Sequence, residues 1–398
     1  MILILVVLLS IVCKLYRRDH FTPSVFIVSS YLLTAIVGII YVICYKGEVY
    51  DYSPFSMIYY IICLFIFLFP FIKFSGNSSL FIFPKRATNL VSYILIGLGF
   101  ISLFFELKDF NYAELALNWL SARNEYYSDF TNIDVATSMS ERISDNIMPL
   151  IFLCFPLAMY HLSQKQKIIC ILLIIVSFTS LISCLKIAER QGIILYIANA
   201  IFAYLIFKKE FSESIRKKIF TLTLIIIGLL VGVLCAITFS RFGDDNESLL
   251  LSLATYAGMQ PLNASYFLED LHTQALGGRL NFPFITGTPM ILILNDEIYS
   301  SEYLNVFGSI VGSYYLDFGY FSVFIIAFVT ALFYKLMTVF KKRKSLLFFY
   351  IYCLYFNIMF VGIFYNKYTS PPHIRNLCLL GIIIWALECV YRDKKRIV

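Results

Sequence analysis

Apolar residues run along this chain in long stretches that are separated by shorter polar segments. Most of the stretches are about 17 to 25 residues long, the length at which an α-helix crosses the hydrocarbon layer of a bilayer. Eleven spans are predicted, at 1–16, 24–45, 55–73, 90–107, 145–162, 167–187, 190–207, 218–239, 308–334, 345–365 and 374–391. The pattern therefore predicts an all-α polytopic membrane protein whose residues 1–398 form a single transmembrane domain.

The composition supports this class. Hydrophobic residues make up 60% of the chain and charged residues 14%, and the mean hydropathy is +0.80, whereas soluble domains carry roughly 25% charged residues. The ten cysteines are scattered singly without a Cys-x-x-Cys pair, so we expect them to be small buried apolar residues. No structural metal, disulfide framework or cofactor is predicted.

The positions of Lys and Arg predict the orientation, because cytoplasmic connections are enriched in positive charge. The alternate connections that begin after the first span hold 22 of the 32 Lys and Arg residues, and the other side holds 10. We therefore expect the N-terminus outside and the C-terminus in the cytoplasm. The net charge of +7 then reflects topology, and not a nucleic-acid partner. If 1–16 is instead a signal-like segment, the remaining orientation stays the same.

Two outer connections are long, 108–144 and 240–305, and long ordered loops are usually functional. The first contains "NYAELALNWLSARNEYYSDF", an amphipathic pattern capped by Asn111 that is typical of a helix in the headgroup plane. Arg123 follows Trp119 by one turn, so its guanidinium would lie at the depth of lipid phosphate. Both a lipid anchor and a ligand-binding role are open for Arg123.

The second long connection begins with a predicted helix over 247–256, capped by Asn246. Further on, Gly277 and Gly278 precede Arg279, and paired glycines permit a positive-φ turn that brings backbone N–H groups and a guanidinium to one point. Such a turn favours an anion. The neighbouring Asp244 and Asp245 pair is interpreted as the solvated start of a helix, and not as a metal site.

The segment "LISCLKIAERQGIILYI" places Lys186, Glu189 and Arg190 between two spans. A hairpin tip in water would explain these charges, but Gly192 is the only typical turn residue nearby. Ionisable residues at membrane depth usually face a cavity, so we favour a polar cavity that receives an anion. Arg outnumbers Lys by 6 to 4 on the outer side, against 7 to 15 inside. Because Arg holds phosphate oxygens bidentately, this asymmetry suggests a diphosphate ligand at the outer leaflet.

Several patches resemble one family. An Arg opens a span in "ERQGIILYI", a Tyr-rich segment "ATYAGMQPLNASYFLEDL" lies in the large outer loop, and "EYLNVFGSIVGSYYLDFGYFSVFI" follows it. With the many spans and the large loop before the last three helices, the chain resembles the Wzy-type polymerases of bacterial O-antigen or capsule repeat units. Phe321 and Ser322 stand where this family pattern would have a small Gly.

The resemblance implies a GT-C-like glycosyltransferase in the bacterial inner membrane. Such an enzyme moves a growing glycan from undecaprenyl diphosphate onto a new lipid-linked repeat unit at the periplasmic face, without a metal or cofactor. Its expected partners are the lipid-linked donor and acceptor, membrane lipids, a flippase and a chain-length regulator. The candidate catalytic residues are Arg190, Arg279, His272 and Glu189, with His373 in reserve, and the candidate diphosphate-binding residues are Arg123, Arg241, Arg375 and Lys186.

Two other functions stay open at this point. An O-antigen ligase would share the donor but use a lipid A core as acceptor. A flippase or other transporter of lipid-linked oligosaccharides would need a polar route through the bilayer, and the sequence contains no clear inverted repeat or pair of broken helices.

Overall fold

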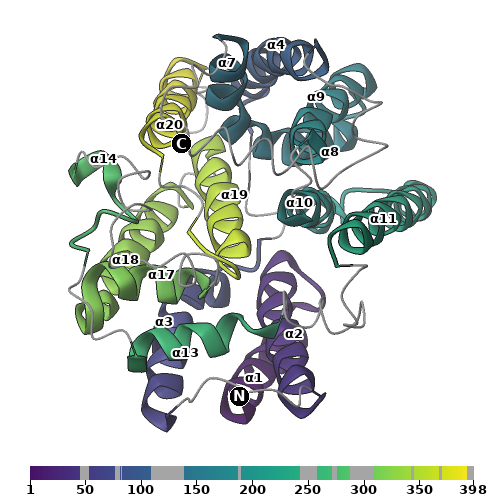
Figure 1. Cartoon of the computed structure of the whole chain (residues 1–398). Coiled ribbons are helices and arrows are strands. Elements are labelled where there is room, and N and C mark those ends of the chain that lie inside the picture. Colours follow the sequence, from purple (N-terminus) through teal and green to yellow (C-terminus); the bar gives the residue numbers. More distant parts are fainter. Residues whose placement is uncertain are drawn as a thin grey trace. The chain divides into compact units, whose positions relative to one another are not determined.

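The computed structural model describes residues 1–44, 53–76, 81, 83–108, 139–186, 190–242, 258–270, 276–286, 308–341, 345–366 and 370–391. Within these ranges all regular structure is helical and no strand occurs (Figure 1). The chain divides into two compact units. The helices and residues of each unit are described separately below.

The first unit comprises Met1–Gly76, Leu250–Lys342 and Tyr355–Arg375. It contains α1 (Ile2–Asp19), α2 (Pro23–Cys44), α3 (Pro54–Lys73), α13 (Gln260–Asp270), α14 (Pro283–Thr286), α17 (Ser309–Phe318), the 3-10 turn η3 (Gly319–Phe321) and α18 (Ser322–Lys341). Helix α13 packs against α2, α3 and α17. It lies in the large loop and was not predicted from the sequence.

The second unit comprises Asn77–Leu249, Arg343–Leu354 and Asn376–Val398. It contains α4 (Lys85–Lys108), α7 (Met139–Ile147), the 3-10 helix η2 (Met148–Leu153), α8 (Cys154–Ser163), α9 (Lys167–Lys186), α10 (Arg190–Phe207) and α11 (Glu213–Phe242). Two further helices, α19 (Leu346–Val361) and α20 (Pro371–Tyr391), contribute residues to both units.

Each of the eleven predicted spans coincides with helical structure. Nine helical stretches in the described ranges are long and apolar enough to cross a membrane, with α7 to α8 and α17 to α18 each counted as one stretch. The protein is therefore a polytopic α-helical membrane protein. Helix α1 and helix α19 are not among the nine: α1 carries charged residues in its last two turns, and α19 has only 16 residues. The total of eleven transmembrane helices stays a prediction.

Two predicted spans are not single helices. The span 145–162 is divided into α7, η2 and α8, because Pro149 and Pro156 lack the backbone N–H that a continuous α-helix needs. The span 308–334 breaks at Gly319, which ends α17 with a φ of 56°, a left-handed conformation that favours glycine. Apolar residues continue on both sides of this break, so hydropathy alone could not reveal it.

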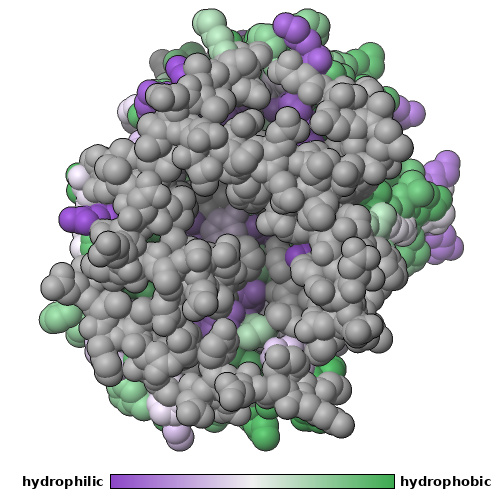
Figure 2. All heavy atoms as spheres, viewed as in Figure 1, coloured by the Kyte–Doolittle hydropathy of each residue, from purple (hydrophilic) through white to green (hydrophobic). Residues whose placement is uncertain are grey.

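Burial differs strongly between the apolar helices. In α10, 67% of the most apolar window is buried, but in α11 only 6% is, and the surface of α11 is largely hydrophobic (Figure 2). Exposed apolar residues on an isolated helix of a soluble protein would be costly. On α11 they are the surface that a bilayer would cover.

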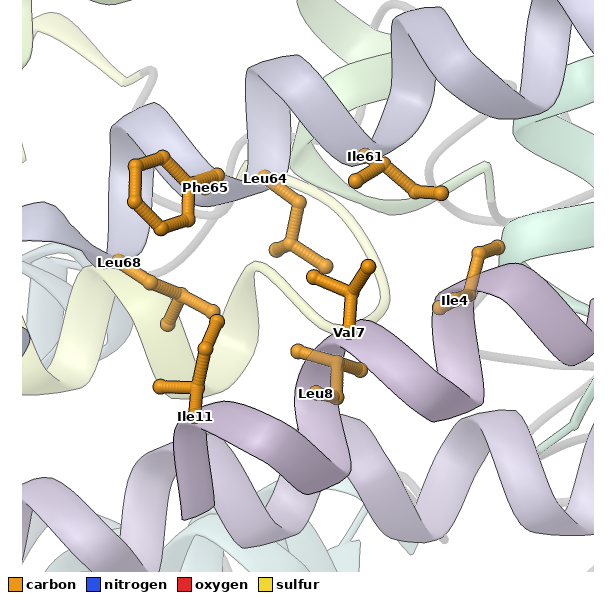
Figure 3. Close-up of a pocket in the computed structure, with 8 residues that line it drawn as sticks. All are labelled: Ile4, Val7, Leu8, Ile11, Ile61, Leu64, Phe65 and Leu68. Carbon is orange, nitrogen blue, oxygen red and sulfur yellow. The ribbon is translucent and has the colours of Figure 1, made fainter. Parts of the chain in front are cut away.

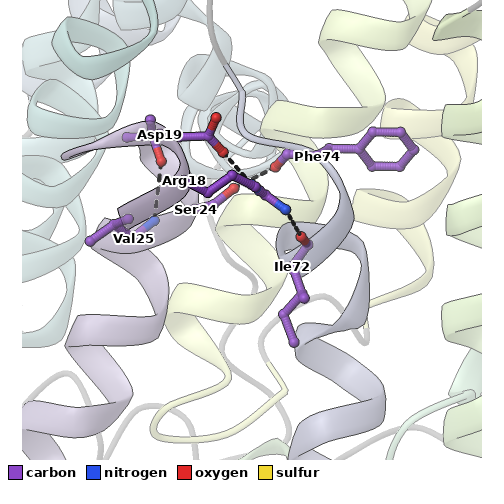
Figure 4. Close-up of polar contacts among 7 residues, drawn as sticks. Arg18, Asp19, Ser24, Val25, Ile72 and Phe74 are labelled. Carbon is purple, nitrogen blue, oxygen red and sulfur yellow. Dashed lines mark hydrogen bonds and ion pairs between the residues drawn. The ribbon is translucent and has the colours of Figure 1, made fainter. Parts of the chain in front are cut away.

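Within each unit, hydrogen bonds join helix ends that the sequence predicts on the same side of the membrane. At the end of α1, the Arg18 guanidinium donates to the Ile72 carbonyl at 2.9 Å, and the Ser24 hydroxyl at the start of α2 donates to the Phe74 carbonyl (Figure 4). In the second unit, Glu388 near the end of α20 accepts hydrogen bonds from the Leu346 and Leu347 amides that begin α19. Each group contains only segment ends that were predicted on one side.

Gly38 and Gly258 allow α2 and the segment before α13 to touch through their backbones. A Cβ atom at Gly38 would lie 2.5 Å from the Gly258 carbonyl oxygen, and one at Gly258 would lie 2.6 Å from the Gly38 nitrogen. Neither obstacle is a side chain that could turn aside. The contact therefore fixes α13 against the end of α2.

We expect Gly38→Ala and Gly258→Ala each to lower the free energy of unfolding by about 1–3 kcal/mol, the usual cost of overpacking. The measurement is unfolding of the detergent-solubilised protein by heat or by SDS. Gly97→Ala is the matched control, because nothing lies within 4 Å of a Cβ atom at this helical position. Equal stability of all three variants would show that the backbone contact does not form.

Candidate functional site

The charged segment 186–190 joins α9 to α10, and the structure describes its two end residues. Lys186 is the last residue of α9 and Arg190 the first of α10, whereas Glu189 lies outside the described residues. Arg190 is 8% exposed and Gln191 5% exposed. One hydrophobic cluster joins the adjoining turns of the two helices and includes Leu181, Cys184, Ile193 and Tyr196.

Lys186 is bound to a buried carboxylate that the sequence analysis did not identify. Its Nζ lies 3.2 Å from Oε2 of Glu106 in the last turn of α4. The Ser144 hydroxyl on α7 donates to Oε1 of Glu106 at 2.7 Å, and the Ser102 hydroxyl lies 2.7 Å from that of Ser144. Glu106 is 6% exposed, and a buried carboxylate is stable only with such donors. The positive charge of Lys186 is thus balanced within the protein.

A sequence signal for Glu106 does exist. It is a lone acidic residue in the last turn of the predicted span 90–107, and ionisable residues at membrane depth usually have a specific partner. The hydropathy pattern places Glu106 at the end of a span, where charged residues are common, so the residue does not stand out in the sequence. Its pairing with Lys186 requires α4 and α9 to end side by side, which only the packing of these helices determines.

The predicted positive-φ turn before Arg279 is present. Gly277 has a φ of 63° and Gly278 a φ of 89°. The amides that follow do bind an anion, but this anion is the side chain of Asp317 at the end of α17. Its Oδ1 accepts from the Leu280 amide at 2.9 Å, and its Oδ2 accepts from the Asn281 amide at 2.6 Å. The backbone of the turn is therefore used internally, and the Arg279 side chain is exposed.

Asn281 extends this arrangement to two other parts of the first unit. Its Nδ2 donates to the Ser313 carbonyl at 2.7 Å and to Oδ2 of Asp317 at 2.6 Å. Its Oδ1 accepts from Nδ2 of Asn366 at 2.9 Å. Asp317 is 0% exposed and Asn281 2% exposed. Buried hydrogen bonds from Leu280 and Asn281 thus fix the segment 276–286 to α17.

The remaining predicted site residues are described only in part. Arg123, Glu189 and His272 lie outside the described residues, as do the helices predicted at 111–130 and 247–256. For Arg241 the structure gives only its place in α11, and Arg375 is exposed in the first turns of α20. Arg190 and Lys186 belong to the second unit and Arg279 to the first. A recess shared by these side chains stays a prediction.

A further buried polar contact lies in the second unit. His161 is buried at the end of α8, where its Nε2 lies 2.7 Å from the Ser92 hydroxyl and its Nδ1 2.5 Å from Oε1 of Gln166. This position adjoins the start of α9, at the other end of that helix from Lys186. Among the residues described, no group of three His, Cys, Asp or Glu side chains is placed to hold a metal ion.

Figure 3 shows a recess between α1 and α3. The residues that line it are all apolar: Ile4, Val7, Leu8, Ile11, Ile61, Leu64, Phe65 and Leu68. These side chains offer no group that could bind charge or transfer a proton.

We expect Glu106 and Lys186 to be energetically coupled. In a double-mutant cycle of Glu106→Gln and Lys186→Met, each single substitution should lower stability, and the coupling should be about 1–3 kcal/mol. Unfolding of the purified protein measures these values. The exposed i,i+4 pair of Glu213 and Lys217 is the matched control, for which we expect coupling near zero. Equal coupling in both pairs would mean that the buried pair does not form.

A scan against protein-family models and searches of curated proteins and of solved structures found no match for this chain. Support for a function therefore comes from the chain's own residues and from the resemblance of its sequence to a family.

Proposed function

We propose that this chain is a membrane glycosyltransferase of the Wzy type, which polymerises undecaprenyl-diphosphate-linked repeat units into O-antigen or capsular polysaccharide. It acts at the periplasmic face of a bacterial inner membrane, with its N-terminus outside and its C-terminus in the cytoplasm. The sequence resemblance supports this proposal, and the many apolar helices are compatible with it.

The burial of Arg190 carries the proposal. Its guanidinium is at the first residue of α10 and is largely shielded from water. Charges interact more strongly where water is excluded, and a guanidinium can donate two parallel hydrogen bonds to phosphate oxygens. Arg190 is therefore the proposed contact of the diphosphate.

The reaction explains why a fixed cation is needed. A hydroxyl oxygen of the acceptor sugar bonds to the anomeric carbon of the donor glycan. The bond from that carbon to the diphosphate oxygen breaks, and its electron pair leaves with the diphosphate. A cation positioned where this negative charge develops lowers the barrier. The acceptor proton passes to a base, for which Glu189 and His272 are the proposed residues, while Arg279, Arg241, Arg375 and Arg123 are proposed contacts of the lipid-linked substrates.

Deletion of the gene in the native host distinguishes a polymerase from a ligase or a flippase. If the chain is a polymerase, the surface polysaccharide on a gel should collapse to one repeat unit attached to the core. A ligase or a flippase would instead leave no repeat unit attached. Unchanged long-chain polysaccharide would contradict all three functions.

Complementation of this deletion tests Arg190. We expect Arg190→Lys and Arg190→Gln to reduce the rate of polymerisation about 100-fold, as loss of one transition-state contact does in other enzymes. The measurement is polymer length and amount, together with the protein level in the membrane. Arg216→Lys, at an exposed arginine of the second unit, is the control and should retain full polymer. Full polymer from both Arg190 variants would remove this residue from the mechanism.

A further inference from the structure

The segment 276–286, predicted as part of the large outer loop, exposes apolar side chains. In α14, Phe284 is 45% exposed and Ile285 72% exposed. Arg279 is also exposed and lies a few residues before them. The segment cannot easily withdraw these side chains, because Asp317 and Asn281 fix its backbone to α17.

The segment adjoins the exposed aromatic residues at the beginning of α18. The Phe282 ring lies 5.9 Å from that of Phe318, and a Cβ atom at Gly278 would lie 3.3 Å from the same ring. Phe318 directly precedes the turn that carries Tyr320 and Phe321, which are 51% and 74% exposed. The exposed side chains continue along α18 through Phe324, Phe328 and Leu332. Exposed apolar residues thus lie both on α14, which the contact of Phe282 with Phe318 holds near the end of α17, and along the candidate membrane span that follows.

The depth of this surface follows from the contacts of α18 with α3. The Tyr59 hydroxyl, within two turns of the start of α3, lies 2.6 Å from that of Ser322, the first residue of α18. The Phe55 and Tyr320 rings are 5.9 Å apart. Both apolar helices therefore begin at one level, and for α3 this level is the predicted outer end of a span. Exposed aromatic residues at this level are typical of a headgroup layer.

We propose that Arg279, Phe284, Ile285, Tyr320 and Phe321 form a headgroup surface that lies in the leaflet where α18 begins. Phe284 and Ile285 insert between lipid chains, and the Arg279 guanidinium binds the phosphate of a lipid headgroup. The backbone amides of the turn already bind Asp317, so the side chain of Arg279 is the group offered to the phosphate. This inference does not require transferase activity.

Tryptophan fluorescence in nanodiscs tests the depth of the surface. The two tryptophans are first replaced, as Trp119→Phe and Trp385→Phe, and Ile285→Trp is introduced. We expect lipids brominated close to the headgroup to quench this tryptophan, and lipids brominated deep in the chain to quench Leu332→Trp in the middle of α18. Lys209→Trp, in the turn after α10, is the water-exposed control. Quenching of Ile285→Trp by aqueous acrylamide but not by brominated lipid would overturn the proposal.

Lipid retention tests the phosphate site. Native mass spectrometry of the detergent-solubilised chain counts bound phosphatidylglycerol, and Arg279→Gln should weaken the binding of one lipid about fivefold. Arg216→Gln is the control for a general loss of charge. Farnesyl diphosphate is then added: displacement of the lipid indicates a preference for a prenyl diphosphate, and retention indicates a bulk phospholipid. Unchanged binding of both lipids in Arg279→Gln would overturn the assignment of this residue.

Discussion

The structure depends on one constraint, that every polar group placed at membrane depth must find a partner inside the protein. Three carboxylates in apolar helices meet it in related ways. Asp317 accepts hydrogen bonds from the backbone amides that follow Gly278, and Glu388 accepts them from the first amides of α19. Glu106 accepts a hydrogen bond from the Ser144 hydroxyl and forms an ion pair with Lys186. Each carboxylate thus stabilises a place where a helix begins, ends or turns. The charges near the membrane boundary are largely structural for this reason.

This distinction changes the weight of the candidate cations. A sequence gives Lys186, Arg190 and Arg279 similar importance, because all three are basic residues beside apolar segments. Their surroundings differ: Lys186 is paired, Arg190 is shielded from water, and Arg279 projects from a rigid turn. A shielded guanidinium suits charge that develops during a reaction, whereas an exposed one at the headgroup level suits a lipid that is already charged.

Local patterns predicted the positions of the helices well, because a span depends on the length and polarity of one segment. They also predicted the positive φ of Gly277 and Gly278. They did not predict the anion in that turn, since Asp317 is distant in sequence and lies in an apolar segment. The break at Gly319 and the partner of Lys186 were missed for the same reason. The roles of Arg123, Glu189 and His272 stay predictions outside the described residues.

The cap of α19 has a consequence for biosynthesis. The amides of Leu346 and Leu347 bind a carboxylate of α20, a helix that the ribosome makes later. During translation α19 would enter the translocon with these amides still lacking their acceptor, and α19 has only 16 residues. The two helices are therefore expected to leave the translocon together as a hairpin, so that a chain interrupted before Glu388 would hold α19 only weakly in the bilayer.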